Sequence, residues 1–332
     1  MSMDEAWARR VVLAQAIETA DTRGTLLGEA ERNEIDRRIR EQAIHAAGGP
    51  KGPPALAHLL HQRAGLVLAA VQRHDSALAA LQEPRPWLRW SAQALPVIAF
   101  ILGVLTDRVA NPQRVDLLSL PLLVIVLWNL AMYALLAVSY AAARPRLQQP
   151  PLPVLRWSVD ALREWRRRSG KVQAEVAARF YTRWHAMTAA LNAQRGRRVL
   201  HLCAALWGAG VAVSLFTRGL VVEYQVGWES TFLSASQVHA ILSVLFMPVV
   251  ALFSQAPFTV DEVARLRFGA GNGAVAGARW VYLYASLLLL VVVLPRLVLA
   301  ALAFGRERAM ARDVAFDLQE AYYQRLIAVI SP

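Results

Sequence analysis

The stretch WVYLYASLLLLVVVLPRLVLAALAF, residues 280–304, decides the class of fold, and Arg296 is its only charged residue. A helix needs roughly 20 predominantly apolar residues to cross the hydrocarbon core of a bilayer, and this stretch is long enough. Four other apolar runs precede it, at residues 88–105, 117–142, 199–222 and 237–253. The sequence therefore predicts an all-α polytopic membrane protein with four to five membrane helices, accompanied by amphipathic helices in the cytosol.

The composition agrees with a membrane protein and excludes several other classes. The chain has 332 residues, of which 56% are hydrophobic and 18% charged, whereas soluble domains carry about 25% charged residues. Its single cysteine, Cys203, excludes a disulfide framework and any multi-cysteine metal site. The net charge of +12 comes mainly from arginine, and no nucleic-acid-binding motif accompanies it. We expect no cofactor, no metal and no nucleic-acid partner.

Polar segments between the apolar runs divide the chain into five predicted regions. They are a cytosolic N-terminal helical region (1–86), membrane helices 1–2 (87–142), a basic cytosolic helical region (143–198), membrane helices 3–5 (199–305) and a C-terminal amphipathic helix (306–332). The third region carries 13 basic and 3 acidic residues. Because short basic flanks stay in the cytoplasm, we expect the N-terminus and residues 143–198 inside, and the loops at 106–116 and 218–234 outside.

The fourth apolar run leaves two topologies open. It is short and contains Pro248; Ser234 with Gln237 predicts a helix start before it, and Thr259 with Glu262 another just after it. If the run crosses the membrane, the C-terminus lies outside; if the run is re-entrant, the C-terminus lies inside. The basic residues do not separate the two, since the outer count is 6 or 7. We favour the re-entrant form, because the C-terminal segment is typical of a cytosolic amphipathic helix.

Arg296 and its neighbours form the first candidate pore or gate. An arginine inside a membrane helix is costly and by default indicates function, with snorkelling to the headgroups as the alternative. Pro295 and Pro248 predict kinks in their helices. Asn129, midway along the second run, is expected to form an interhelical hydrogen bond and is included among the candidates.

The loop after the third run supplies the other pore or gate candidates: Glu223, Trp228, Glu229, Ser230 and Thr231. Acidic residues at an entrance concentrate cations and repel anions, and one of them could instead pair with Arg296. The alternative is an interfacial turn that aromatic side chains anchor in the membrane surface.

Basic residues in the third region are candidates for lipid or anion contact: Arg163, Arg166, Arg167 and Arg168. The alternative is that they act only as a topology signal. His201 and His239 open the third and fourth runs at opposite membrane faces, so a haem held by both is not expected.

Four motifs occur together in this chain: Arg114-Val-Asp-Leu-Leu, Trp128, the segment 227–233 (GWESTFL) and the segment 294–299 (LPRLVL). In these motifs the chain resembles the bacterial integral membrane family catalogued as domain of unknown function 2868, over about residues 85–305. The resemblance implies a protein of the bacterial inner membrane that is often encoded beside a predicted GTPase. The resemblance also favours Trp228, Glu229, Ser230, Thr231, Pro295 and Arg296 as functional residues, because they lie in the motifs that the chain shares with the family.

These observations predict an oligomeric ion channel or transporter, a homo-oligomer surrounded by membrane lipids and regulated through its cytosolic helices. The alternative is a non-conducting membrane scaffold or anchor for a cytosolic GTPase partner. We do not expect an enzyme, because the sequence holds no HExxH, no GxSxG and no paired carboxylates within a span.

Overall fold

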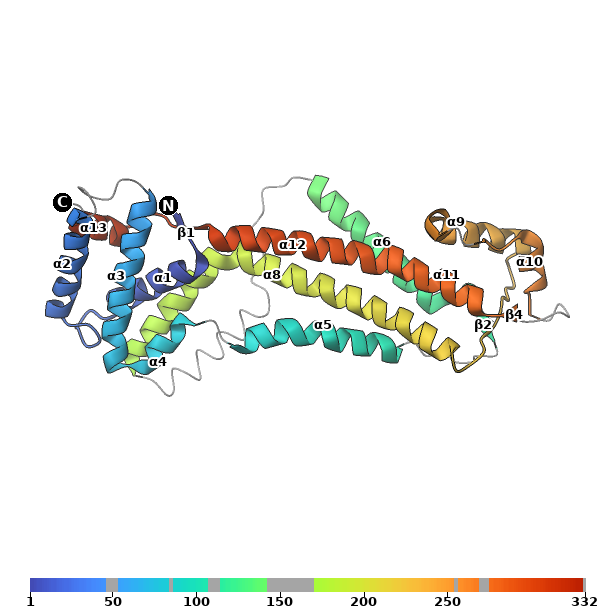
Figure 1. The fold of residues 1–332 in the computed structure, drawn as a ribbon, viewed down its shortest axis with the longest axis horizontal. Helices are drawn as coiled ribbons and strands as arrows, with labels where there is room; N and C mark the ends of the chain where they lie inside the picture. Colours follow the sequence, from blue (N-terminus) through green and yellow to red (C-terminus); the bar gives the residue numbers. More distant parts are fainter. Residues whose placement is uncertain are drawn as a thin grey trace. The chain divides into compact units, whose positions relative to one another are not determined.

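The computed structural model describes residues 1–45, 53–83, 86–106, 114–141, 170–253, 256–268 and 275–330 and is mainly helical (Figure 1). The chain divides into two compact units. Unit 1 combines Met1–Pro86, Gln148–Arg195 and Phe304–Pro332, and unit 2 combines Trp87–Leu147 and Gly196–Ala303. Two long helices, α8 (Lys171–Gly219) and α12 (Leu294–Arg312), contribute residues to both units.

Unit 1 is a helical bundle around one apolar core. Its elements are α1 (Glu5–Ala20), α2 (Glu29–His45), α3 (Pro53–His74), α4 (Ser76–Ala79), the 3-10 turn η1 (Ala80–Gln82), α13 (Ala321–Ile330) and parts of α8 and α12. Val12, Ile39, Val67, Phe180 and Tyr323 are buried together in this core, although they come from five different helices. The N-terminal, middle and C-terminal polar regions of the sequence therefore fold as one body.

A short sheet joins the N-terminal and C-terminal segments of unit 1. Strand β1 (Ser2–Met3) pairs antiparallel with β5 (Val314–Ala315), with Ser2 opposite Ala315. Within the same unit, the Arg183 guanidinium on α8 forms an ion pair of 2.5 Å with Glu320, just before α13. Residues near both ends of the chain consequently lie on the same folded body.

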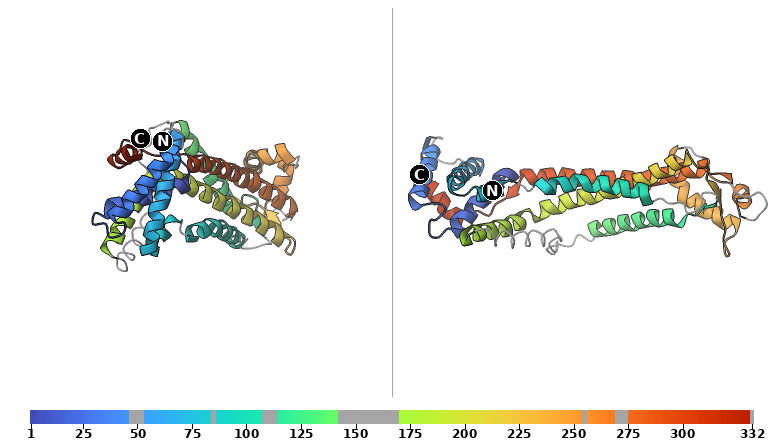
Figure 2. Two further views of the ribbon diagram at one scale, coloured as in Figure 1. Left: turned by 60° about the vertical axis from the view of Figure 1, so that its left-hand side comes forward. Right: turned by 90° about the horizontal axis from the view of Figure 1, so that it is seen from below.

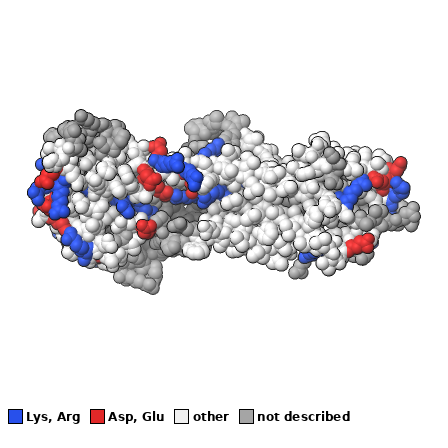
Figure 3. Space-filling view, in the orientation of Figure 1, with Lys and Arg blue, Asp and Glu red and all other residues white. Residues whose placement is uncertain are grey.

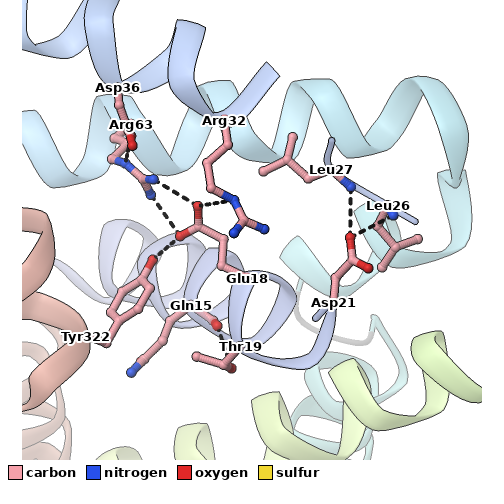
Figure 4. A network of polar contacts seen from close by, with 10 residues as sticks. All are labelled: Gln15, Glu18, Thr19, Asp21, Leu26, Leu27, Arg32, Asp36, Arg63 and Tyr322. Carbon is pink, nitrogen blue, oxygen red and sulfur yellow. Dashed lines mark hydrogen bonds and ion pairs between the residues drawn. The ribbon is translucent and has the colours of Figure 1, made fainter. Parts of the chain in front are cut away.

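A buried network of charged groups ties four helices of unit 1 together (Figure 4). The Arg63 guanidinium on α3 donates to the Glu18 carboxylate on α1 at 2.8 and 2.9 Å and to Asp36 on α2 at 2.8 Å. The Tyr322 hydroxyl on α13 also donates to Glu18, and Arg32 lies 3.8 Å from it. Burial alone would lower the pKa of Arg63, but the hydrogen bonds and charge of Glu18 outweigh it and raise that pKa.

Unit 2 contains the apolar helices α5 (Pro86–Thr106), α6 (Leu120–Ala141), α9 (Ala235–Phe253) and α11 (Ala278–Leu288), the last running through a π-helical turn, η2 (Leu289–Val293), into α12. Four described helices are long and apolar enough to cross a membrane: Leu120–Ser139, Lys171–Gly219, Ala235–Phe253 and Ala278–Arg312. Trp90–Thr106 of α5 adds a shorter apolar stretch. Figure 3 shows the surface over these helices largely free of charged residues, and the apolar helices indicate a membrane-embedded protein.

The helices of unit 2 pack closely where glycines face a neighbouring helix. A Cβ atom at Gly103 of α5 would collide with the Trp207 carbonyl of α8, and one at Gly210 with the Phe100 carbonyl. Helix α8 also runs beside α11, η2 and the start of α12 in all views (Figure 1, Figure 2), where Gly208 faces the side chain of Val292.

The loops of unit 2 meet in a small structure that we call the cap, residues 114–119, 218–234, 256–268 and 275–279. Its sheet has the order β2–β3–β4, with β2 (Val115–Asp116) parallel to β3 (Gln225–Gly227) and β3 antiparallel to β4 (Val275–Ala276). The short helix α10 (Val260–Arg265) lies beside it (Figure 1). The two loops expected outside the membrane thus contribute adjacent strands, which the all-α prediction did not include.

Helix α9 leaves the cap and the chain after it returns to the cap. Before α9, the Ser230 carbonyl accepts a hydrogen bond from Arg267 at 3.3 Å; after it, the Ala256 carbonyl accepts one from Arg279 at 3.2 Å. The helix continues through Pro248 and starts at the expected Ser234–Gln237 capping contacts. Its buried face packs on the core of unit 2 through Val238, Leu242, Phe246 and Val249.

Candidate functional site

Arg296 is the centre of a polar cluster inside the apolar helices of unit 2, and only 7% of the residue is exposed. Its Nε donates to Oδ1 of Asn129 on α6 at 2.9 Å. Its Nη1 lies 3.3 Å from Nδ1 of His201 on α8, and its Cζ lies 5.2 Å from the ring centroid of Tyr133 on α6. Three helices therefore converge on one guanidinium, and we call Asn129, Tyr133, His201 and Arg296 the Arg296 cluster.

Pro295 explains the second contact of Tyr133. A proline has no N–H, so the carbonyl four residues earlier, that of Val291, loses its helical hydrogen bond. The Tyr133 hydroxyl donates to this carbonyl at 2.9 Å. The helix also takes its π-helical turn, residues 289–293, immediately before Pro295, and such turns are frequent at functional sites. Pro295 thus exposes a backbone acceptor that α6 uses to hold the cluster in place.

The Arg296 cluster carries one positive charge, and its other three members are neutral groups. Arginine stays protonated in proteins, and an acceptor role for His201 Nδ1 requires the neutral ring with its proton on Nε2. No aspartate or glutamate occurs at residues 117–141, 176–222 or 263–306. Among the described residues, no carboxylate forms an ion pair with Arg296. Burying a charge costs several kcal/mol after relaxation, which the amide, the imidazole and the tyrosine ring offset in part.

The candidates of the 227–233 segment lie in the cap, and each has partners of its own there. Trp228 is 1% exposed, and its Nε1 donates to the Val263 carbonyl at 2.6 Å. Glu229 forms an exposed ion pair with Arg114, so it does not meet Arg296, the pairing that the sequence left open. The arrangement makes Trp228 an anchor between the segment and α10.

The remaining cap candidates shape a turn or face the surface. The Ser230 hydroxyl accepts hydrogen bonds from the backbone N–H groups of Phe232 and Leu233, at 3.2 and 3.0 Å. Glu223 and Thr231 are exposed. The described cap residues hold equal numbers of basic and acidic side chains: Arg114, Arg218, Arg265, Arg267 and Arg279 against Asp116, Glu223, Glu229, Asp261 and Glu262. Over its described residues the cap is therefore balanced in charge, and an acidic entrance formed by Glu223 and Glu229 stays a prediction.

Glu262 links the start of α10 to other residues of the cap. Its carboxylate accepts hydrogen bonds from Arg279 at 3.1 and 3.2 Å and completes the expected capping box with Thr259. The hydrogen bond from Arg279, followed by the backbone hydrogen bond from Thr259, lowers the pKa of Glu262 to about 2. This carboxylate consequently stays charged through the ordinary pH range.

Arg163, Arg166, Arg167 and Arg168, the candidates for lipid or anion contact, lie outside the described residues. In the part of the chain that the structure describes, no group of three His, Cys, Asp or Glu residues could hold a metal ion.

Sequence reasoning singled out Arg296 and Asn129 but missed the contribution of Tyr133 and the partnership of His201. Tyr133 follows Asn129 by four residues, and residues at that spacing share a helix face. This spacing was the available signal. His201 gave none, because its position on α8 beside Arg296 depends on tertiary packing.

The fold and the cluster define a membrane-embedded helical protein with a buried cationic site. More particularly, a family model described as protein of unknown function (DUF2868) matches residues 165–332, and the chain belongs to that family. The match includes Trp228 and Arg296. The resemblance seen in the sequence covered about residues 85–305; the family model leaves out α5 and α6 of that range and extends beyond it to include α13. A search of the curated proteins and a search of the solved structures give no match.

Proposed function

We propose that this protein is an ion channel or transporter of the bacterial inner membrane, in which the Arg296 cluster is the polar site along the ion path. The observation that carries the proposal is a buried arginine held by neutral groups from two neighbouring helices. Ionisable groups inside membrane helices are rare, and they mark substrate and ion pathways. A bundle that needed only stability would use apolar packing at this position.

The proposed topology has four crossings, formed by α5, α6, α8 and the α11–α12 helix, with α9 re-entrant from the outer side. The pairing of β1 with β5 supports it, because segments from both ends of the chain then lie on one side of the membrane and the number of crossings is even. The cap contacts on both flanks of α9 support the re-entrant form. The basic residues of the middle region favour the cytoplasm for that shared side.

Reporter fusions test this topology. Green fluorescent protein attached after residue 332 is expected to fluoresce, whereas alkaline phosphatase at the same place is expected to be inactive, since each reporter works on one side of the inner membrane. The same two reporters inserted after residue 230 in the cap should give the opposite pattern. An active alkaline phosphatase after residue 332 would contradict an even number of crossings.

We further propose that the protein is a homo-oligomer regulated through unit 1. Large apolar side chains on α5 and α6 support association, because Trp90 and Trp128 are 71% and 65% exposed in a single chain. Lipid and neighbouring copies would together cover these faces. In a symmetric oligomer each copy contributes one Arg296 cluster around the symmetry axis, and ions would pass near these clusters.

The main experiment measures the oligomeric state of the detergent-purified protein and the ion flux of liposomes that contain it. We expect a symmetric oligomer and a flux that Arg296→Gln abolishes. The matched control is Arg265→Gln, which removes an exposed arginine of α10 in the same unit and should leave the flux unchanged. A monomer without flux, or equal flux in both variants, would refute the proposal.

A second candidate function is a membrane scaffold for a cytosolic GTPase. The observation that favours it is unit 1 itself, a body with its own core and its own buried ion network. Nucleotide-dependent binding of a GTPase encoded beside the gene to full-length protein in liposomes, together with no ion flux, would establish this function instead.

A further inference from the structure

We infer that the Arg296 cluster binds a small monovalent anion of the chloride class. This inference deepens the proposed function by naming the ion, and it rests on that function for its physiological meaning. It starts from the charge balance of the cluster: one permanent cation, three neutral partners and, among the described residues, no carboxylate that pairs with it.

The donors of the cluster suit an anion. A guanidinium has five N–H groups, and Asn129, His201 and Tyr133 engage at most three of them. The Tyr133 hydroxyl donates to the Val291 carbonyl and also interacts with the guanidinium, but it is a neutral group and does not neutralise the charge. Arg197, one turn before His201 on α8, adds to the positive potential at this place. The cluster is thus fixed in position by its neighbours, while no carboxylate in the described part of the chain compensates its charge.

The apolar surroundings strengthen the attraction between this cation and an anion, because Coulomb energies increase as the effective dielectric constant falls. They also restrict the ligand. One deeply buried positive charge balances one negative charge, and a divalent or larger polyatomic anion would bring charge and polar oxygens that the described residues around Arg296 do not pair. Only 7% of Arg296 is exposed, so little of its surface is open to a ligand, and this favours a small ion.

Chloride titration of the detergent-purified full-length protein tests the inference, with the width of the ³⁵Cl resonance as the measurement. Bound chloride in exchange with the bulk broadens the line. We expect a saturable excess width with the unmodified protein that added bromide displaces. No saturable broadening in the unmodified protein would overturn the inference, whatever any variant shows.

The decisive variant is Asn129→Asp, which places a carboxylate where Oδ1 lies 2.9 Å from Arg296 Nε while leaving the arginine in place. The side chain keeps its shape and loses only the Nδ2 donor to the Ile125 carbonyl. An internal counter-ion should lower the chloride affinity at least about tenfold, since a Coulomb interaction at this distance exceeds one decade in affinity. Unchanged affinity would overturn the inference.

Asn192→Asp is the matched control. Asn192 also lies beside an arginine, Arg195, at 3.4 Å, but that arginine already forms ion pairs with Glu5 and Glu307. The variant changes the net charge by the same amount and should bind chloride like the unmodified protein. An equal loss of chloride affinity in the two variants would overturn the inference. Displacement of chloride by phosphatidylglycerol but not by bromide would also overturn it, because this result would identify a lipid headgroup as the ligand.

Flux measurements separate this inference from the proposed function. Saturable chloride binding that Asn129→Asp abolishes, without any flux from liposomes, would support the anion site and refute transport. Flux of ions without saturable chloride binding would support transport and overturn the anion site.

Discussion

Replacing Arg63 by methionine should destabilise unit 1 strongly. Arg63 is the shared partner of Glu18 and Asp36, and its side chain is 3% exposed beside a Glu18 side chain that is 6% exposed. Methionine keeps much of the apolar volume and removes the charge, so the main effect is to leave two carboxylates without their common cation. Removing one partner of a buried ion pair costs about 3–5 kcal/mol.

The structure points to the lower end of that range. Arg32 lies 3.8 Å from Glu18, and the Tyr322 hydroxyl donates to it, so part of the compensation survives. A loss of about 3 kcal/mol corresponds to a fall of roughly 6–12 °C in melting temperature for a unit of about 150–250 residues. The assay is scanning fluorimetry in detergent, with peptide-level hydrogen exchange assigning the transition to α1, α3 and α13.

Arg37→Met is the matched control, because Arg37 forms its ion pairs with Glu34 and Glu41 on the exposed surface of α2. Water and salt screen such pairs, and we expect no measurable shift. A fall with Arg63→Met no larger than that of the control would refute the conclusion that the buried network holds the two ends of the chain on one body.

Replacing Gly103 by leucine should separate α5 from α8 and lower the melting temperature of unit 2. In the control Gly65→Ala on α3, no atom lies within 4 Å of the new carbon, so the melting temperature should stay the same or rise. Acid should weaken the cap: the pKa of Glu262 falls from 4.5 unfolded to about 2 folded, so its stabilisation is complete above about pH 4.5 and is lost as the pH falls through 2. Glu262→Gln should remove that part of the unfolding profile, and an unchanged profile would contradict the assignment. Tyr133→Phe leaves the Val291 carbonyl without its donor and should cost about 0.6 kcal/mol in detergent unfolding, typical of one hydrogen bond between membrane helices; a stabilised variant would contradict this.

Hydrophobic runs predicted most of the apolar helices. The run at 237–253 became α9 (Ala235–Phe253), and the run at 280–304 lies within the α11–α12 helix, which continues to Arg312. The third run differs, since α8 begins at Lys171 and passes into the apolar part without a break. No proline interrupts it there, so the change from polar to apolar marks a change of environment and not a helix end.

Pairings between distant residues could not be read from the sequence. Arg296 and Asn129 were both candidates, but they are 167 positions apart, and periodicity within each helix says nothing of which helices adjoin. Glu229 with Arg114 is similar, at 115 positions. The two-residue strands β1 and β5 are too short to show an alternating pattern, and yet their pairing is the observation that supports the proposed even number of crossings.

The pairing of β1 with β5 also sets an order of events during synthesis. Ser2 is made about 300 residues before its partner Ala315, an interval of roughly 15–60 s at the usual rates of bacterial translation. During that time β1 lacks its partner β5, and in the proposed topology all the apolar helices enter the membrane in this interval. In the proposed topology, completion of this sheet would therefore report that the last helix has been inserted in the orientation that returns residue 315 to the side of residue 2.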